Sequence, residues 1–110
     1  MKILIDESLD VRLKTHFENY DVSTARDMNW LGKKNGELLK LIGENNFDVF
    51  LTADKNLRHQ QNLSHINFVV IVLNSIYSEL SFHILLVPKV LEIINNLKQN
   101  KLSEKFFEVE

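Results

Sequence analysis

Acidic residues follow two apolar runs of the chain and begin one amphipathic segment, and these are the residues whose types could do chemistry. Asp6 directly follows residues 2–5, Asp54 lies just beyond residues 49–52, and Glu37 falls in the first turn of a predicted helix. The two runs are short, apolar and flanked by polar residues, as strands buried in a parallel sheet are. Strand ends and the starts of following helices share one edge of such a sheet, so these three carboxylates are expected to converge.

A divalent cation is the chemistry that such a convergence predicts. Carboxylates without a matching cluster of Lys or Arg repel one another, and a hard cation removes the repulsion. Ligation by oxygen alone favours Mg²⁺ or Mn²⁺ over zinc. Glu7, next to Asp6, is a less certain fourth ligand.

Each acid also has a simpler interpretation. Asp6 and Glu7 stand between a strand and a helix, where acids cap helix ends, and Glu37 would favour the helix dipole without any chemistry. Asp54 could cap a turn formed by residues 55–57. Taken singly, capping is the commoner role of such acids, and it is their expected meeting at one edge that favours the metal site.

Other catalytic patterns are missing from the sequence. The four histidines have no metal-ligand spacing, and we interpret all of them as solvated or core residues. The chain has no cysteine, no G-x-S-x-G elbow and neither of the glycine patterns that cradle phosphate groups.

The rest of the chain predicts the elements that position the acids. Ser8 is expected to cap a helix that buries Leu9, Leu13 and Phe17, and Asn35 a helix from Gly36 to about Asn45. Pro88 should divide the apolar helical pattern of residues 78–97 near Leu86. The remaining predictions are strands at 21–24, 68–73 and 106–109, a loop at 25–34 and a short helix or turn at 55–63.

These elements alternate, which predicts one α/β domain over residues 1–110. The expected architecture is three layers, α/β/α, around a mainly parallel sheet of about 4–5 strands with right-handed crossovers, and the last strand could run either way. A net charge of −2 provides no global basic field for nucleic acid, so such a role would need a local patch. No signal peptide or membrane span is evident, and a cytoplasmic protein is expected.

Three segments together resemble the short PIN-like proteins, a compact branch of the PIN-domain nucleases. They are residues 3–9 (Ile-Leu-Ile-Asp-Glu-Ser-Leu), residues 35–39 (Asn-Gly-Glu-Leu-Leu) and residues 48–57 with 60–63, of which the Thr-Ala-Asp strand end is the most specific part. The resemblance implies a metal-dependent ribonuclease, often the toxin half of a bacterial toxin–antitoxin pair. The family's acids carry over to Asp6, Glu37 and Asp54.

Two departures from the family pattern concern activity rather than fold. Larger PIN nucleases carry a further acid on an additional helix, for which this chain has no segment, although Glu7 could substitute. Many relatives also have a second Asp two residues after the Thr-x-Asp acid, where this chain has Asn56. An amide supplies an oxygen ligand without the charge, which should weaken metal binding.

The leading hypothesis is therefore a Mg²⁺- or Mn²⁺-dependent endoribonuclease in which Asp6, Glu37 and Asp54 hold the metal. Lys55, Asn56 and Arg58 would contact the RNA, while Trp30 is interpreted as a partly buried anchor rather than a stacking platform. Expected partners are the RNA substrate, a small antitoxin protein and a second copy of the chain.

Two alternatives compete with this hypothesis. One is a catalytically weak or inactive PIN-like module that binds RNA or a protein partner. The other is a phosphoacceptor receiver, which shares the acids after its first and third strands but needs a lysine at the end of a late strand. Here the strand at 68–73 is followed by Asn74-Ser75, and Lys89 falls inside a predicted helix, so the receiver is discounted.

Overall fold

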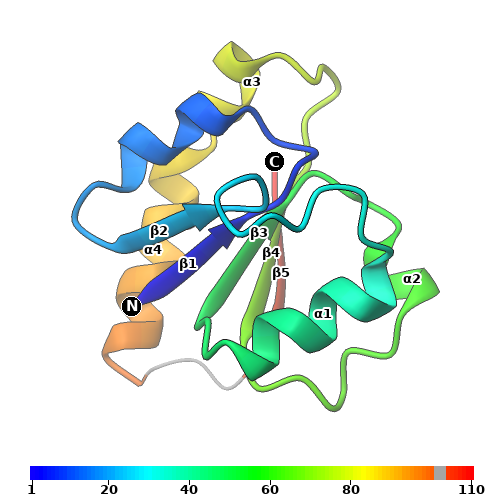
Figure 1. Cartoon of the computed structure of the whole chain (residues 1–110). Helices are drawn as coiled ribbons and strands as arrows, with labels where there is room; N and C mark the ends of the chain where they lie inside the picture. The colour runs from blue at the N-terminus through cyan, green and yellow to red at the C-terminus, as the bar shows by residue number, and fades with distance from the viewer. Residues whose placement is uncertain (101–103) are drawn as a thin grey trace.

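Five parallel strands form one sheet with helices on both faces in this computed structural model, which describes residues 1–100 and 104–110. The α/β class and the three-layer α/β/α arrangement predicted from the sequence are confirmed (Figure 1). The elements in chain order are β1 (Lys2–Ile5), the 3₁₀ helix η1 (Val11–Phe17), β2 (Asp21–Thr24), α1 (Asn35–Glu44), β3 (Val49–Thr52), α2 (Leu57–Gln60), β4 (Val69–Leu73), α3 (Leu80–Ile84), α4 (Val87–Lys98) and β5 (Phe106–Val109).

The strand order β2-β1-β3-β4-β5 determines where the site lies. The chain first moves from β1 to β2 at one edge, then returns across β1 to β3 and continues to β5. The direction therefore reverses between β1 and β3, which are paired with Ile5 opposite Leu51. Ligands of doubly wound sheets collect at this switch point, beyond the carboxyl ends of the strands.

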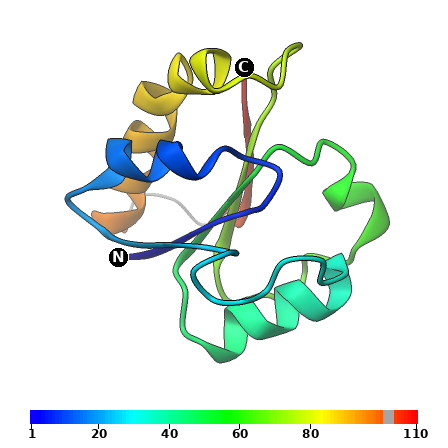
Figure 2. The same ribbon diagram turned by 45° about the horizontal axis from the view of Figure 1, so that its top comes forward.

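Alternate residues of the central strands supply two separate cores. Ile3, Ile5 and Leu51 face η1 and α4, whereas Leu4 and Phe50 face α1 and α2. Because both faces are covered, every residue of β3 is buried, as expected of a central parallel strand. Figure 2 shows the same division, with η1, α3 and α4 on one side of the sheet and α1 and α2 on the other.

The crossover from β4 to β5 does not follow the right-handed rule that we expected of all four connections. α4 and η1 cover the same face of the sheet. The step from β4 to β5 goes across the sheet in the direction opposite to the step from β1 to β2, so the two connections have opposite hands. The first three connections are right-handed and the fourth is left-handed (Figure 1). With seven residues, η1 is too short to cover its face alone, and α4 buries the rest with Val90 and Ile94.

The local predictions differ from the structure mainly at helix starts. Asp10, not Ser8, caps η1, accepting a hydrogen bond from the N–H of Arg12, and Asn35 is already the first residue of α1. Pro88 stands in the first turn of α4, where its missing N–H costs nothing, so the expected break between α3 and α4 is confirmed. β5 pairs in parallel with β4, which settles its direction. No helix among the described residues is long and apolar enough to cross a membrane.

Candidate functional site at the ends of β1 and β3

A single buried hydroxyl group joins Asp6 and Asp54. Thr52, the last residue of β3, is 1% exposed. Its Oγ1 donates to Asp6 Oδ2 at 2.9 Å and accepts a hydrogen bond from the N–H of Asp54 at 3.1 Å. The two acids that follow β1 and β3 therefore meet at the switch point of the sheet.

Ser8 reinforces this arrangement from the loop that follows β1. Its hydroxyl donates to Asp6 Oδ2 at 2.6 Å and accepts the N–H of Ala53 at 3.0 Å. The backbone N–H of Asp6 donates to the carbonyl of Leu51 at 2.9 Å, which continues the β1–β3 ladder up to the site. Asp6 Oδ2 thus has two hydroxyl donors within hydrogen-bonding distance.

The amino end of α1 lies beside Asp54. The side-chain amide of Asn35 donates to Asp54 Oδ2 at 3.1 Å, and Asp54 Oδ1 accepts the N–H of Asn56 at 3.0 Å. The second bond is the turn cap that we considered as the simpler role of Asp54. The carboxylate therefore caps the turn and also holds the start of α1 at the switch point.

Glu37 and Glu7 have other partners. Glu37, in the first turn of α1, forms an exposed ion pair with Lys33 at 3.2 Å. Glu7 accepts the N–H of Gly32 at 3.0 Å, and Gly32 has a φ of +81°, a backbone conformation that favours glycine. Within residues 1–100 and 104–110, no three His, Asp or Glu side chains form a group that could hold a metal ion.

The residues predicted to contact RNA differ in what they touch. Lys55 and Asn56 are exposed beside Asp54, whereas the guanidinium of Arg58 lies 4.8 Å from the ring centroid of Phe106. Trp30 is 9% exposed and its ring packs edge-on against Phe47, so the prediction of a buried anchor is confirmed.

The histidines are solvated or core residues, as predicted. His16, His59 and His65 are exposed, and His83 in α3 is 2% exposed. Among the buried side-chain nitrogen and oxygen atoms of the described residues, only Nδ1 of His83 has no hydrogen-bond partner. Burial lowers the pKa of the His83 imidazole below its usual value, because the charged form would be desolvated.

Ser8 and Asn35 were missed as members of the site, because the sequence places both where helix caps are expected. The signal that could have identified them is the presence of small polar residues next to acids at a strand end and at a helix start. The ends of β4 and β5 carry a different pairing, in which the amide of Asn74 donates to Glu108 at 2.8 Å. Lys89 lies in α4, and its ammonium group donates to the carbonyl of Glu110.

Fold and site together define a three-layer, doubly wound α/β domain in which one Thr52 hydroxyl bonds to the Asp6 carboxylate and to the backbone N–H of Asp54 at the switch point. No known protein family, curated protein or solved structure matches the chain. The resemblance to the short PIN-like proteins therefore rests on the three sequence segments that suggested it, as do the predicted antitoxin and homodimer.

Proposed function

We propose that the chain is a metal-dependent ribonuclease that hydrolyses phosphodiester bonds at the ends of β1 and β3. The observation that carries this proposal is the Thr52 hydroxyl that links Asp6 and Asp54. It supports a site in which the Asp6 carboxylate is linked to the backbone of Asp54. The described hydrogen bonds of the two carboxylates are formed with hydroxyl, amide and backbone groups, and none of these partners is cationic.

The carboxylate oxygens of Asp6 and Asp54 fit a Mg²⁺ or Mn²⁺ ion that keeps much of its water shell. Mg²⁺ is usually bound through one or two carboxylates together with substrate phosphates, so a third protein ligand is not required. Asp6 and Asp54 would hold the cation, and when bound it would activate water and stabilise negative charge on the phosphate. Glu37 would join only by leaving Lys33, and an exposed ion pair of this kind is weak.

The surrounding residues have roles that need no metal. The amide of Asn35 fixes the orientation of the Asp54 carboxylate, and the hydroxyls of Ser8 and Thr52 fix that of Asp6. Lys55 lies next to Asp54 and is exposed, so its ammonium group can attract a phosphate.

A module that binds RNA or a protein without cleaving is the second candidate. The observation that favours it is that the described residues hold no group of three potential metal ligands. Both oxygens of Asp54 also accept hydrogen bonds from amide groups, which would compete with a cation.

Cleavage of a labelled single-stranded RNA by the full chain tests the proposal. Hydrolysis is expected with Mn²⁺ or Mg²⁺, should stop in EDTA and should not respond to a zinc-selective chelator. Asp6→Asn and Asp54→Asn should each lower the rate by at least tenfold. Asp21→Asn is the matched control, because Asp21 is exposed at the start of β2, away from the strand ends that carry the site.

Metal binding is measured separately, by calorimetric titration of Mn²⁺ into wild type and the same variants. Binding that is lost in Asp6→Asn and kept in Asp21→Asn supports the metal site. RNA that stays intact at high protein and Mn²⁺ concentrations, with RNA binding retained, would favour the binding module instead.

A further inference from the structure

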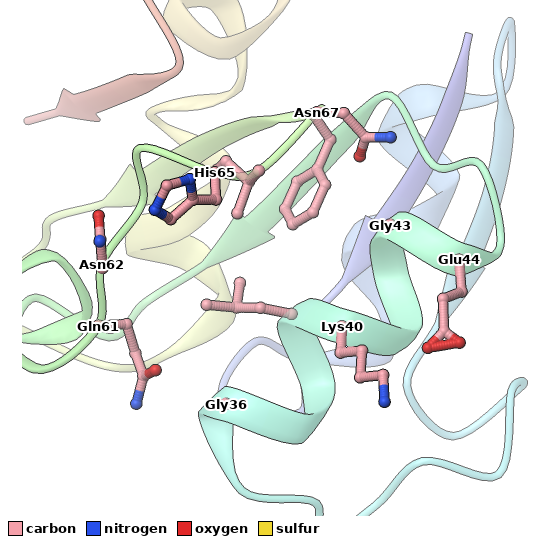
Figure 3. A pocket seen from close by; sticks show the side chains of 11 residues that line it. Gly36, Lys40, Gly43, Glu44, Gln61, Asn62, His65 and Asn67 are labelled. Atoms are coloured by element: carbon pink, nitrogen blue, oxygen red, sulfur yellow. The ribbon is translucent and has the colours of Figure 1, made fainter.

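A groove of about 480 Å³ runs along α1, on the side of the helix that faces the segment following α2. Its helical wall is formed by Gly36, Leu39, Lys40, Gly43 and Glu44. The opposite wall is the segment 61–68, which contributes Gln61, Asn62, His65, Ile66, Asn67 and Phe68 (Figure 3). The volume is within the range of pockets that bind small ligands.

Two glycines of the helical wall allow the opposite wall to pack close to α1. Gly36 and Gly43 are seven residues apart, which is about two turns and about 10 Å along the same side of the helix. A Cβ atom at Gly43 would lie 3.2 Å from the side-chain oxygen of Asn67, and one at Gly36 would lie 3.6 Å from that of Gln61. Hydrogen atoms in place of side chains therefore let Gln61 and Asn67 of the segment 61–68 approach the helix closely.

Apolar and polar groups are divided within the groove in a way that suits a flat heteroaromatic ring. Leu39 and Phe68 are 8% and 3% exposed and form the apolar floor of the groove. The side chains of Gln61, His65 and Asn67 line the groove, and His65 and Asn67 are exposed, so their donors and acceptors are available to a ligand. An apolar floor with amide groups at its edge can contact a nucleobase and read its hydrogen-bonding edge.

The groove begins next to the candidate site. Gly36 stands between Asn35, which bonds to Asp54, and Glu37. Gln61 follows directly after α2, the helix that succeeds Asp54. Lys40 carries a positive charge on the helical wall, whereas Glu44 would repel a phosphate farther along α1. A nucleotide strand is therefore expected to place its backbone towards Gly36 and Lys40.

We propose that this groove binds a nucleobase of single-stranded RNA, next to the phosphate that is cleaved at the strand ends. The position of that phosphate rests on the proposed ribonuclease function, whereas binding of the base rests on the groove alone. A free nucleotide offers the same base chemistry, so the test distinguishes the two sources.

The test maps binding on the ¹⁵N-labelled full chain in EDTA, so that metal-dependent hydrolysis does not intervene. The probes are hexamers of adenylate and of uridylate, together with AMP and UMP. At least one hexamer should shift the amide signals of Gly36, Gly43 and residues 61–68, and should bind at least tenfold more tightly than its mononucleotide. Asn67→Ala and His65→Ala should each raise the Kd for the hexamer several-fold, up to about tenfold. His16→Ala is the matched control, because His16 is exposed on η1 at the other face of the sheet.

The possible results separate this inference from the proposed function. Shifts confined to other residues, or no shift with any probe, would overturn the groove. Equal affinity for hexamer and mononucleotide would assign the groove to a free nucleotide and overturn the RNA-strand inference. Groove binding without Mn²⁺-dependent cleavage would reject the ribonuclease and leave the groove supported. Cleavage with a KM for RNA that is unchanged in Asn67→Ala and His65→Ala would support the ribonuclease and overturn the groove.

Discussion

Removing the Thr52 hydroxyl is the most direct perturbation of the candidate site. Thr52→Val keeps the shape of the side chain and removes Oγ1, which donates to Asp6 at 2.9 Å and accepts from Asp54 N–H at 3.1 Å. Ser8 Oγ, at 3.3 Å from Oγ1, also loses a neighbour. The substitution therefore removes the hydroxyl link between Asp6 and Asp54 without changing either residue.

The magnitude follows from three contributions. A hydrogen bond to a charged acceptor contributes about 1.5–3 kcal/mol, and a buried N–H left without a partner costs about 1–3 kcal/mol. Asp54 is half-buried, so water can reach its N–H and the second cost lies at the low end. A buried methyl group in place of the hydroxyl returns about 1 kcal/mol. The sum is a loss of about 2 kcal/mol in the free energy of unfolding, or roughly 8 °C in Tm.

Urea denaturation of wild type, Thr52→Val, Asp6→Asn and the double variant measures this prediction. The double-mutant cycle should give a coupling energy of about 1 kcal/mol or more between positions 6 and 52. Thr52→Ser, which retains the hydroxyl, is the control and should lose less stability than Thr52→Val. A coupling energy near zero, with Thr52→Val as stable as wild type, would refute the link between the two acids.

Two further predictions concern Asp54 and His83. Asp54→Asn should lower the free energy of unfolding by about 1 kcal/mol, because an amide cannot accept from both Asn35 and Asn56 without a rearrangement; a more stable variant in thermal melts would instead indicate carboxylate repulsion. His83→Leu should stabilise the protein, because it removes a buried nitrogen without a partner. Because the pKa of His83 is lowered in the folded protein, the unfolded chain binds a proton at this residue at a higher pH than the folded protein does. The free energy of unfolding therefore decreases as the pH falls below about 6.5, by at most about 1.4 kcal/mol per pH unit. The Leu variant should lose that part of the pH dependence in urea titrations from pH 7.5 to 5, and equal slopes would contradict the assignment.

The sequence by itself determined the elements and the positions of the two central acids. Four-residue apolar runs such as Val49–Thr52 are too short for helices and too apolar for exposed strands, so their type and burial follow from composition. Asp6 and Asp54 come directly after such runs, and a parallel sheet brings the ends of its strands to one edge whatever the strand order.

Only the tertiary structure decided which polar groups meet at that edge. Asn35 has the sequence pattern of a helix cap, yet its amide bonds to Asp54, 19 residues away, and Asp6 bonds to Thr52, 46 residues away. Glu37 lies towards the same edge of the sheet, but its ion-pair partner is Lys33, four residues earlier in the chain. Local pattern shows what a side chain can bond to, whereas its actual partner depends on the distances that the packed sheet imposes.

The hand of the last crossover and the groove beside α1 are tertiary properties for the same reason. The amphipathic pattern of α4 shows that one side of it is buried, but not which face of the sheet buries it. That choice depends on how much of each face the other helices already cover, and the seven-residue η1 is shorter than the ten-residue α1, which shares its face with α2. The groove likewise exists only because α1 and residues 61–68, which are separated in the chain by β3 and α2, pack beside each other.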